Sequence, residues 1–112
     1  MVRSGSLVVG ALRLLWEDEQ MWGPQPPEAA YVHGLVVDRG HAGLGLGRAL
    51  LDWAGQQARH AGRRQLRLDC SEDNAALRTY YQQHGFETVG RRDFDGHWYS
   101  VVLLDKALEQ ER

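Results

Sequence analysis

The sequence predicts a mixed α/β (α+β) fold, in which a mostly antiparallel sheet has a parallel central pair of strands and helices on its faces. Three observations predict it. Short segments are rich in apolar and β-branched residues, two intervening segments repeat small or apolar residues every three or four positions, and an Asp-Gly pair near the C-terminus marks a tight turn. The predicted order of elements is β-β-α-β-α-β-β.

The N-terminal half of the chain is expected to form two strands separated by a loop. Residues 7–16 are mostly apolar and begin with β-branched residues, which favours a strand. Residues 17–30 hold all three prolines, so we expect a loop there. Residues 31–37 then predict a second, well-buried strand.

Two helices and a third strand are predicted next. Small and apolar residues recur at helical spacing from Leu46 to Ala61, and Gly62 stands where a helix ends. Residues 65–70 alternate strictly between polar and apolar, which is typical of a strand with one buried face. Residues 75–84 predict a second helix that ends before a glycine.

The C-terminal segment predicts a β-hairpin. Asp95-Gly96 joins two strand-like runs, 86–94 and 97–104, and a two-residue Asp-Gly turn is a strong hairpin signal. The two strand–helix–strand units imply locally parallel pairing, whereas the hairpin adds an antiparallel edge to the sheet.

Length and charge exclude several functional classes. The 112 residues fit one domain, 1–112, and 13 Lys plus Arg against 15 Asp plus Glu give a net charge of −2, unlike a general nucleic-acid binder. The longest uncharged apolar run, 7–12, is far shorter than the roughly 20 residues of a membrane helix. A single cysteine, Cys70, fits a reducing compartment. We therefore expect a cytoplasmic protein without nucleic-acid or membrane partners.

Glycines cluster between the second predicted strand and the first predicted helix. Five of them fall between Gly34 and Gly47. Backbone N–H groups and the dipole at a helix start can bind an anion such as a phosphate. A Walker A loop is excluded because Arg48-Ala49, not Lys-Ser/Thr, follows the last glycine. The G-x-G-x-G spacing also departs from the Rossmann fingerprint, and no plausible acidic ribose ligand lies about twenty residues further on.

Two motifs together resemble the GNAT superfamily of acyl-CoA-dependent N-acetyltransferases. The segment Ala42-Gly43-Leu44-Gly45-Leu46-Gly47 resembles that family's Q/R-x-x-G-x-G/A pyrophosphate loop. Downstream, Asn74 precedes a predicted helix and Tyr81 stands four residues before Gly85-Phe86, as in the family. The resemblance runs from about residue 7 to the end. Ala42 replaces the usual Gln or Arg, and the chain is N-terminally short, lacking the family's usual first strand and helices.

The resemblance implies acetyl-CoA as cosubstrate, no metal, and transfer of the acetyl group to a primary amine by direct attack. The cofactor-binding positions that it implies are Leu35, Val36, Val37, Ala42, Gly43, Leu44, Gly45, Leu46, Gly47, Arg48 and Asn74. It assigns Tyr81 as the acid that protonates the CoA sulfur, whereas Tyr80 is read as a packing residue. Asn74 has a second reading, as the N-cap of its helix.

The candidate general base is His33, on the second predicted strand where several GNAT enzymes carry a glutamate. Its imidazole suits proton transfer near neutral pH, although a strand histidine can also be a hydrogen-bonded core residue. Glu17, Asp18 and Glu19 could attract a cationic amine or be solvated loop residues. The five histidines show no metal-binding spacing.

The sequence is also compatible with a second function. Ala42 and the short N-terminus are compatible with a non-catalytic acyl-CoA-binding or interaction domain. An exposed sheet edge recruits other strands, so a homodimer is a further expectation.

Overall fold

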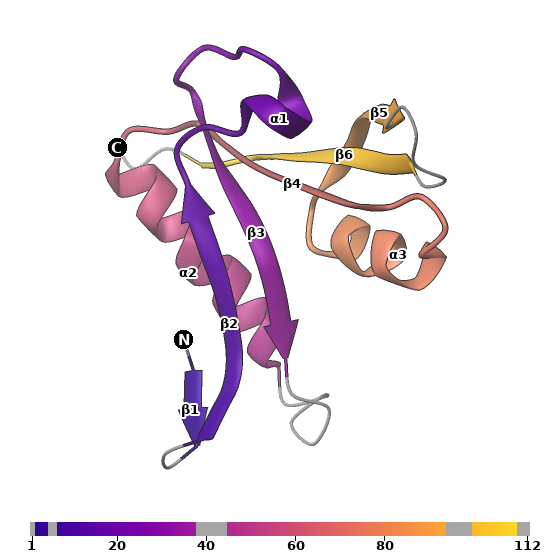
Figure 1. Ribbon diagram of the computed structural model, residues 1–112. Helices are drawn as coiled ribbons and strands as arrows, with labels where there is room; N and C mark the ends of the chain where they lie inside the picture. The colour runs from indigo at the N-terminus through magenta and orange to yellow at the C-terminus, as the bar shows by residue number, and fades with distance from the viewer. Residues whose placement is uncertain (1, 5–6, 38–44, 94–99, 110–112) are drawn as a thin grey trace.

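The computed structural model describes residues 2–4, 7–37, 45–93 and 100–109. Within these ranges a six-stranded sheet has the order β1-β2-β3-β4-β6-β5 (Figure 1). The strands are β1 (Val2–Ser4), β2 (Leu7–Leu15), β3 (Ala29–Val37), β4 (Gln65–Ser71), β5 (Glu87–Asp93) and β6 (Ser100–Ala107). The helices are α1 (Glu19–Trp22), α2 (Leu46–His60) and α3 (Ala75–Gln83).

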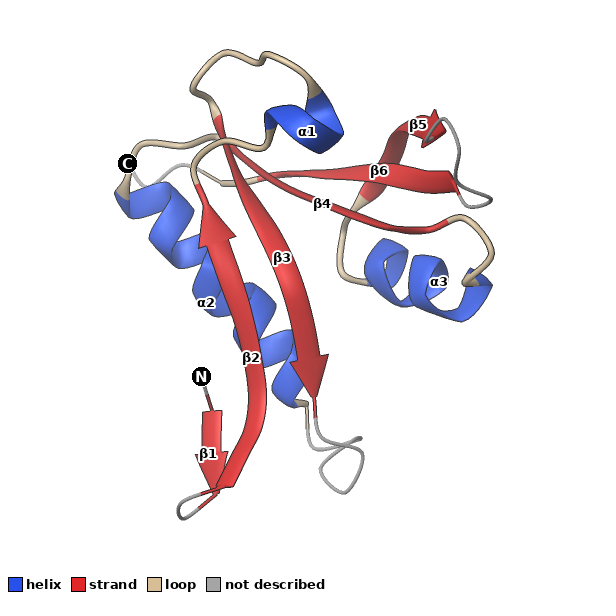
Figure 2. Cartoon of the chain, in the orientation of Figure 1, coloured by secondary structure: helices blue, strands red, loops and turns tan. Residues whose placement is uncertain are grey.

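The pairing confirms the predicted fold class. β3 and β4 form a parallel central pair, and every other described pair is antiparallel. Figure 2 shows the two longer helices, α2 and α3, beside different parts of the sheet. Both contribute to one core, because Leu51, Ala54 and Ala58 of α2 and Tyr81 of α3 belong to the same buried cluster. Cys70 lies in this cluster as an unpaired, buried side chain.

One predicted pairing is wrong. The two strands of the second strand–helix–strand unit, β4 and β5, do not pair in parallel with each other, because β6 lies between them. The reason is composition: β6 buries Val101, Val102 and Leu104, whereas β5 is exposed along almost its whole length. The apolar strand therefore takes the interior position and the polar strand takes the edge. The expected turn at Asp95-Gly96 lies outside the described residues.

The structure contains two elements that the predicted order lacks, β1 and α1. β1 pairs antiparallel with β2 and forms one edge of the sheet. The helix α1 interrupts the segment predicted to be a loop, because Asp18 caps it: the Asp18 side chain accepts a hydrogen bond from the Met21 amide. The prolines begin only after this helix has ended. None of the described helices is long and apolar enough to cross a membrane.

Candidate functional site

The centre of the site is an opening between β3 and β4. These strands pair only from Ala29↔Gln65 to Tyr31↔Arg67. Beyond that point β3 continues to Val37 and β4 turns away toward α3 (Figure 1). Among the described strands, the far part of β3 therefore pairs only with β2, and its other side is available to a ligand with hydrogen-bonding groups.

A bulge in β3 decides which side chains face the helices. Arg13 of β2 pairs with His33 and Ala11 pairs with Val36, so β3 holds one extra residue in this interval. Gly34 has φ +62°, a conformation that favours glycine. As a result Val32 and Leu35 both pack toward the helices, while His33 between them lies on the opposite face.

A cavity of about 560 Å³, the helix-side cavity, lies among the end of β3, the start of α2 and one side of α3. Its lining residues are Leu35, Val37, Gly45, Leu46, Gly47, Arg48, Leu77, Tyr80, Tyr81 and His84. The fold thus brings most of the described candidate cofactor residues together with Tyr81. Leu77 and His84 were not singled out from the sequence, although their spacing of three and four from Tyr80 places them on the same helix face.

Two candidate residues are placed differently, and three others are not described by the structure. Val36 is 59 % exposed and does not line the helix-side cavity. Asn74 caps α3, since its Oδ1 accepts a hydrogen bond of 3.0 Å from the Leu77 amide. Ala42, Gly43 and Leu44 lie outside the described residues.

The start of α2 presents backbone donors to this cavity. Gly45 is the N-cap, with φ +75° and no side-chain hydrogen bond to the helix. The amides of the first turn have no partner within an α-helix, which leaves them able to bind an anion. Gly47 has a separate role, because a Cβ there would come within 2.5 Å of the Tyr80 hydroxyl. The sequence alone suggested only phosphate access for this glycine.

Tyr81 is 5 % exposed and packs edge-to-face against Phe86, with ring centroids 5.8 Å apart. Burial, with smaller contributions from Cys70, Tyr80 and Asp69, raises the pKa of Tyr81 to about 12. Its hydroxyl is therefore protonated at any physiological pH. Tyr80, read from the sequence as a packing residue, does pack against the core and also lines the cavity.

On the other face of the sheet, His33 meets two carboxylates. Its Nε2 lies 2.5 Å from Oδ2 of Asp18, and one potential ligand atom of each of His33, Asp18 and Asp69 lies within 4.8 Å of the others. Burial raises the pKa of Asp69 above its ordinary value, opposed by His33 and reinforced by Asp18. Within the described ranges this is the one group of three such side chains that could hold a metal ion. Asp69 was missed because its partners come from distant segments.

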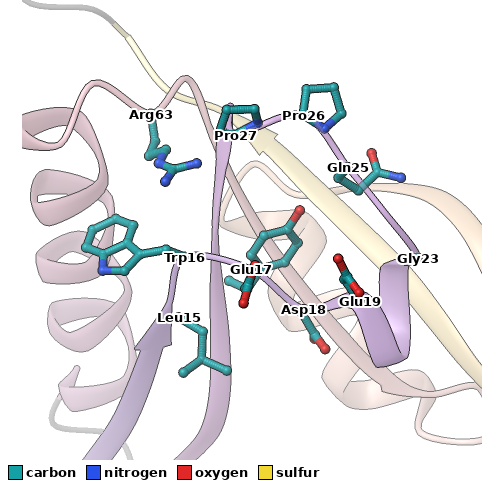
Figure 3. Close-up of a pocket in the computed structure, with 11 residues that line it drawn as sticks. Leu15, Trp16, Glu17, Asp18, Glu19, Gly23, Gln25, Pro26, Pro27 and Arg63 are labelled. Carbon is teal, nitrogen blue, oxygen red and sulfur yellow. The ribbon is translucent and has the colours of Figure 1, made fainter.

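A second cavity, of about 490 Å³, lies on the same face and is called the loop-side cavity here (Figure 3). It is lined by Leu15, Trp16, Glu17, Asp18, Glu19, Gly23, Gln25, Pro26, Pro27, Tyr31 and Arg63. The three acids that the sequence suggested for attracting an amine all belong to it. Asp18 both lines this cavity and contacts His33.

Arg67 connects several elements beside the loop-side cavity. Its guanidinium donates to Asp105 at 2.8 Å and to the Tyr31 hydroxyl at 3.1 Å, and it lies 4.8 Å from the centre of the Trp22 ring. Because these contacts join β3, β4, β6 and α1, they fix the segment between β2 and β3 against the sheet.

Comparison with known proteins agrees with this architecture. Residues 2–86 match the model of the Acetyltransferase (GNAT) family. Uncharacterized N-acetyltransferase YesJ of Bacillus subtilis is 38 % identical over 74 residues, which cover 65 % of this chain and 41 % of that protein. Mycothiol acetyltransferase of Geodermatophilus obscurus is 42 % identical over 72 residues, which cover 63 % of this chain and 23 % of that protein. The chain thus matches less than half the length of either relative.

A solved structure shows the same fold. Nourseothricin acetyltransferase superimposes with a TM-score of 0.78 at 23 % identity, over 94 % of this chain and 61 % of that one. The family match spans most of the chain and includes the first predicted strand, the glycine segment and Tyr81. The chain therefore belongs to the GNAT family of acetyltransferases.

Proposed function

We propose that this chain is an acetyl-CoA-dependent N-acetyltransferase that moves an acetyl group to a primary amine by direct attack, with both substrates bound together. The observation that carries the proposal is the opening between β3 and β4. On one side of this opening lies the helix-side cavity, which Tyr81 lines, and His33 lies on the other face of the sheet. A thioester and an amine could meet there from opposite sides of the sheet.

The helix-side cavity suits the cosubstrate in shape and donors. The amides from Gly45 to Arg48 would bind the pyrophosphate, together with the loop residues Ala42, Gly43 and Leu44. The unpaired side of β3 at Leu35, Val36 and Val37 would pair with the amides of the pantetheine arm, which explains why Val36 can take part without lining the cavity. Asn74 would contact the arm through the amide nitrogen that its cap hydrogen bond does not use.

The proposed reaction uses two proton-transfer groups on opposite faces. The amine nitrogen attacks the thioester carbonyl, an N–C bond forms and the C–S bond breaks. Backbone N–H groups near Val36 and Val37 would stabilise the negative charge on the carbonyl oxygen. His33 would take the proton that the amine loses, and the Tyr81 hydroxyl would donate a proton to the departing sulfur.

Asp18 and Asp69 give His33 a defined setting. A carboxylate at 2.5 Å fixes the orientation of the imidazole and stabilises it once it has accepted a proton. Asp69, on the neighbouring strand, lies close enough to strengthen this effect. The cluster is therefore proposed as a base assembly, with His33 as the group that meets the amine.

The test is calorimetric titration of the chain with acetyl-CoA and, as a matched pyrophosphate control, with NADH. Micromolar binding of acetyl-CoA alone, followed by release of CoA thiol when primary amines are added, is the expected result. Binding without thiol release from any amine would favour the non-catalytic acyl-CoA-binding alternative. No acetyl-CoA binding by a chain shown to be folded by circular dichroism would refute both readings.

The proposal includes a cytoplasmic location and a homodimer. The unpaired, buried Cys70 is compatible with a reducing compartment, and β1 and β5 offer edge strands through which a second copy could pair. Light scattering of the eluting protein would measure the mass, and a monomeric mass at all concentrations would exclude the dimer.

A further inference from the structure

The loop-side cavity combines negative charge with apolar walls. Its volume of about 490 Å³ lies in the range of small-molecule sites. None of its lining residues is among those proposed to bind acetyl-CoA. Leu15, Trp16, Pro26 and Pro27 supply apolar surface, and Glu17, Asp18 and Glu19 supply carboxylates. In the view of Figure 3 the three acids lie on one side of the cavity and Arg63, Pro26 and Pro27 lie on the other.

The charges in this cavity favour a cation. Three carboxylates face one guanidinium, that of Arg63, which lies over the Trp16 ring at 5.5 Å from its centre. The Asp18 carboxylate contacts His33. In the part of the chain that the structure describes, neither Glu17 nor Glu19 has an ion-pair partner within 4.0 Å. A positive group on a ligand would therefore find two acidic side chains beside it.

The cavity also leads to the proposed base. Asp18 forms part of its wall and holds His33 at 2.5 Å, so a ligand in contact with Asp18 has one end close to the imidazole. Tyr31, another lining residue, precedes His33 by two positions on β3 and therefore faces the same side of the sheet. The cavity and the base thus share Asp18 and lie on the same face of the sheet.

We propose that the loop-side cavity is the acceptor site and that its acceptor is an aliphatic amine with at least two amino groups. This inference rests on the proposed N-acetyltransferase activity. Glu17 and Glu19 hold a protonated amino group, and the apolar residues contact the methylene chain. The second amino group, in its neutral form, lies at His33. An acceptor with a carboxylate at its far end is repelled by the same acids.

The test compares three acceptors with the same four-carbon chain: 1,4-diaminobutane, butylamine and 4-aminobutanoate. They differ only at the fourth carbon, which carries an ammonium group, carries no polar group, or is the carbon of a carboxylate. With acetyl-CoA present, we expect kcat/KM for thiol release to be about tenfold higher for the diamine than for butylamine, since two exposed acids each contribute a modest attraction. The value for 4-aminobutanoate should be the lowest.

Two variants locate the effect. Glu17→Gln combined with Glu19→Gln should lower kcat/KM for the diamine toward the value for butylamine, while KM for acetyl-CoA stays the same. Glu87→Gln is the matched control, because Glu87 is an exposed acid on β5 outside both cavities, and it should keep the preference for the diamine. Equal rates with all three acceptors, or an unchanged preference in the Glu17/Glu19 variant, would overturn the inference while leaving the proposed function intact.

A binding measurement distinguishes failure of the proposed function from failure of the acceptor inference. If no amine is acetylated, the proposed function fails, and the acceptor inference is then decided by titration of the chain with 1,4-diaminobutane. Trp16 lines the cavity and reports binding through its fluorescence. A saturable change that the Glu17/Glu19 variant loses would support the cavity as a diamine site. No saturable change would overturn it.

Discussion

The hydroxyl of Tyr80 lies 2.5 Å from the point that a Cβ on Gly47 would occupy. This contact joins the first turn of α2 to α3, across the helix-side cavity. Gly47 therefore leaves room for the Tyr80 side chain beside the start of α2, because an alanine there would overlap the Tyr80 oxygen.

Gly47→Ala is expected to weaken acetyl-CoA binding by at least about tenfold and to lower stability by roughly 1–3 kcal/mol, which is typical when a packed site is overfilled. Calorimetric titration and urea unfolding measure the two effects. The double variant Gly47→Ala with Tyr80→Phe should recover most of both losses, since the next nearest Tyr80 atom is 3.5 Å from the added methyl group.

Gly55→Ala provides the control for this substitution. Its Cβ would make an ordinary contact of 3.5 Å with Leu108, so the better helix propensity of alanine should leave stability equal or higher by about 0.5–1 kcal/mol. If Gly47→Ala behaves like Gly55→Ala, the contact with Tyr80 does not constrain the site.

Tyr81→Phe is expected to lower kcat by about 10²- to 10⁴-fold, the range for loss of a general acid, with little change in acetyl-CoA affinity. Single-turnover measurement of thiol release and titration with acetyl-CoA test the two parts. Tyr80→Phe is the matched control on the same helix and should lower kcat only slightly. A normal kcat in Tyr81→Phe would remove Tyr81 from the mechanism.

His33→Ala should slow the reaction, because the imidazole is the group proposed to take the proton from the attacking amine. We expect kcat to fall by about 10²-fold or more, with little change in acetyl-CoA affinity. Single-turnover measurement of thiol release and calorimetric titration with acetyl-CoA test the two parts. A normal kcat in His33→Ala would show that another group takes the proton.

Asp18→Asn separates the two roles of Asp18. Asparagine caps helices about as well as aspartate, so α1 and the thermal midpoint should be nearly unchanged. The carboxylate that faces His33 is lost, and kcat at saturating acceptor should fall by about tenfold. A kcat equal to that of the wild-type chain would mean that Asp18 only shapes the loop.

Asp69 should make stability depend on pH. Burial raises the pKa of its carboxyl, so the folded state binds the proton more tightly than the unfolded state does. The stability that this adds is present at acid pH and is lost as the pH rises through the folded-state pKa. Asp69→Asn should therefore gain stability relative to the wild-type chain between acid and neutral pH.

Paired urea titrations of the two chains at several pH values measure this difference. The exposed Asp73→Asn is the matched control. A stability difference between Asp69→Asn and wild type that falls with rising pH would contradict the predicted sign.

The strongly patterned elements could be predicted because their signals are local. Alternation over 65–70 became β4, and the three- and four-residue spacing after Gly45 became α2. The position of β6 could not be predicted from neighbouring residues, since it depends on which strand has the more apolar surface to bury. The short helix α1 was missed because the prolines that follow it indicate a loop.

For the site, the sequence by itself determined the family resemblance and the approximate cosubstrate loop, because the glycine spacing and the Tyr81-to-Gly85 interval are properties of the chain order. Only the tertiary structure brought Asp18 and Asp69 to His33, since these residues come from three separate segments. Only the tertiary structure placed His33 and Leu35 on opposite faces, because the bulge at Gly34 reverses a strand's normal alternation. Contacts between distant segments depend on how strands pair and diverge, and no local pattern records that.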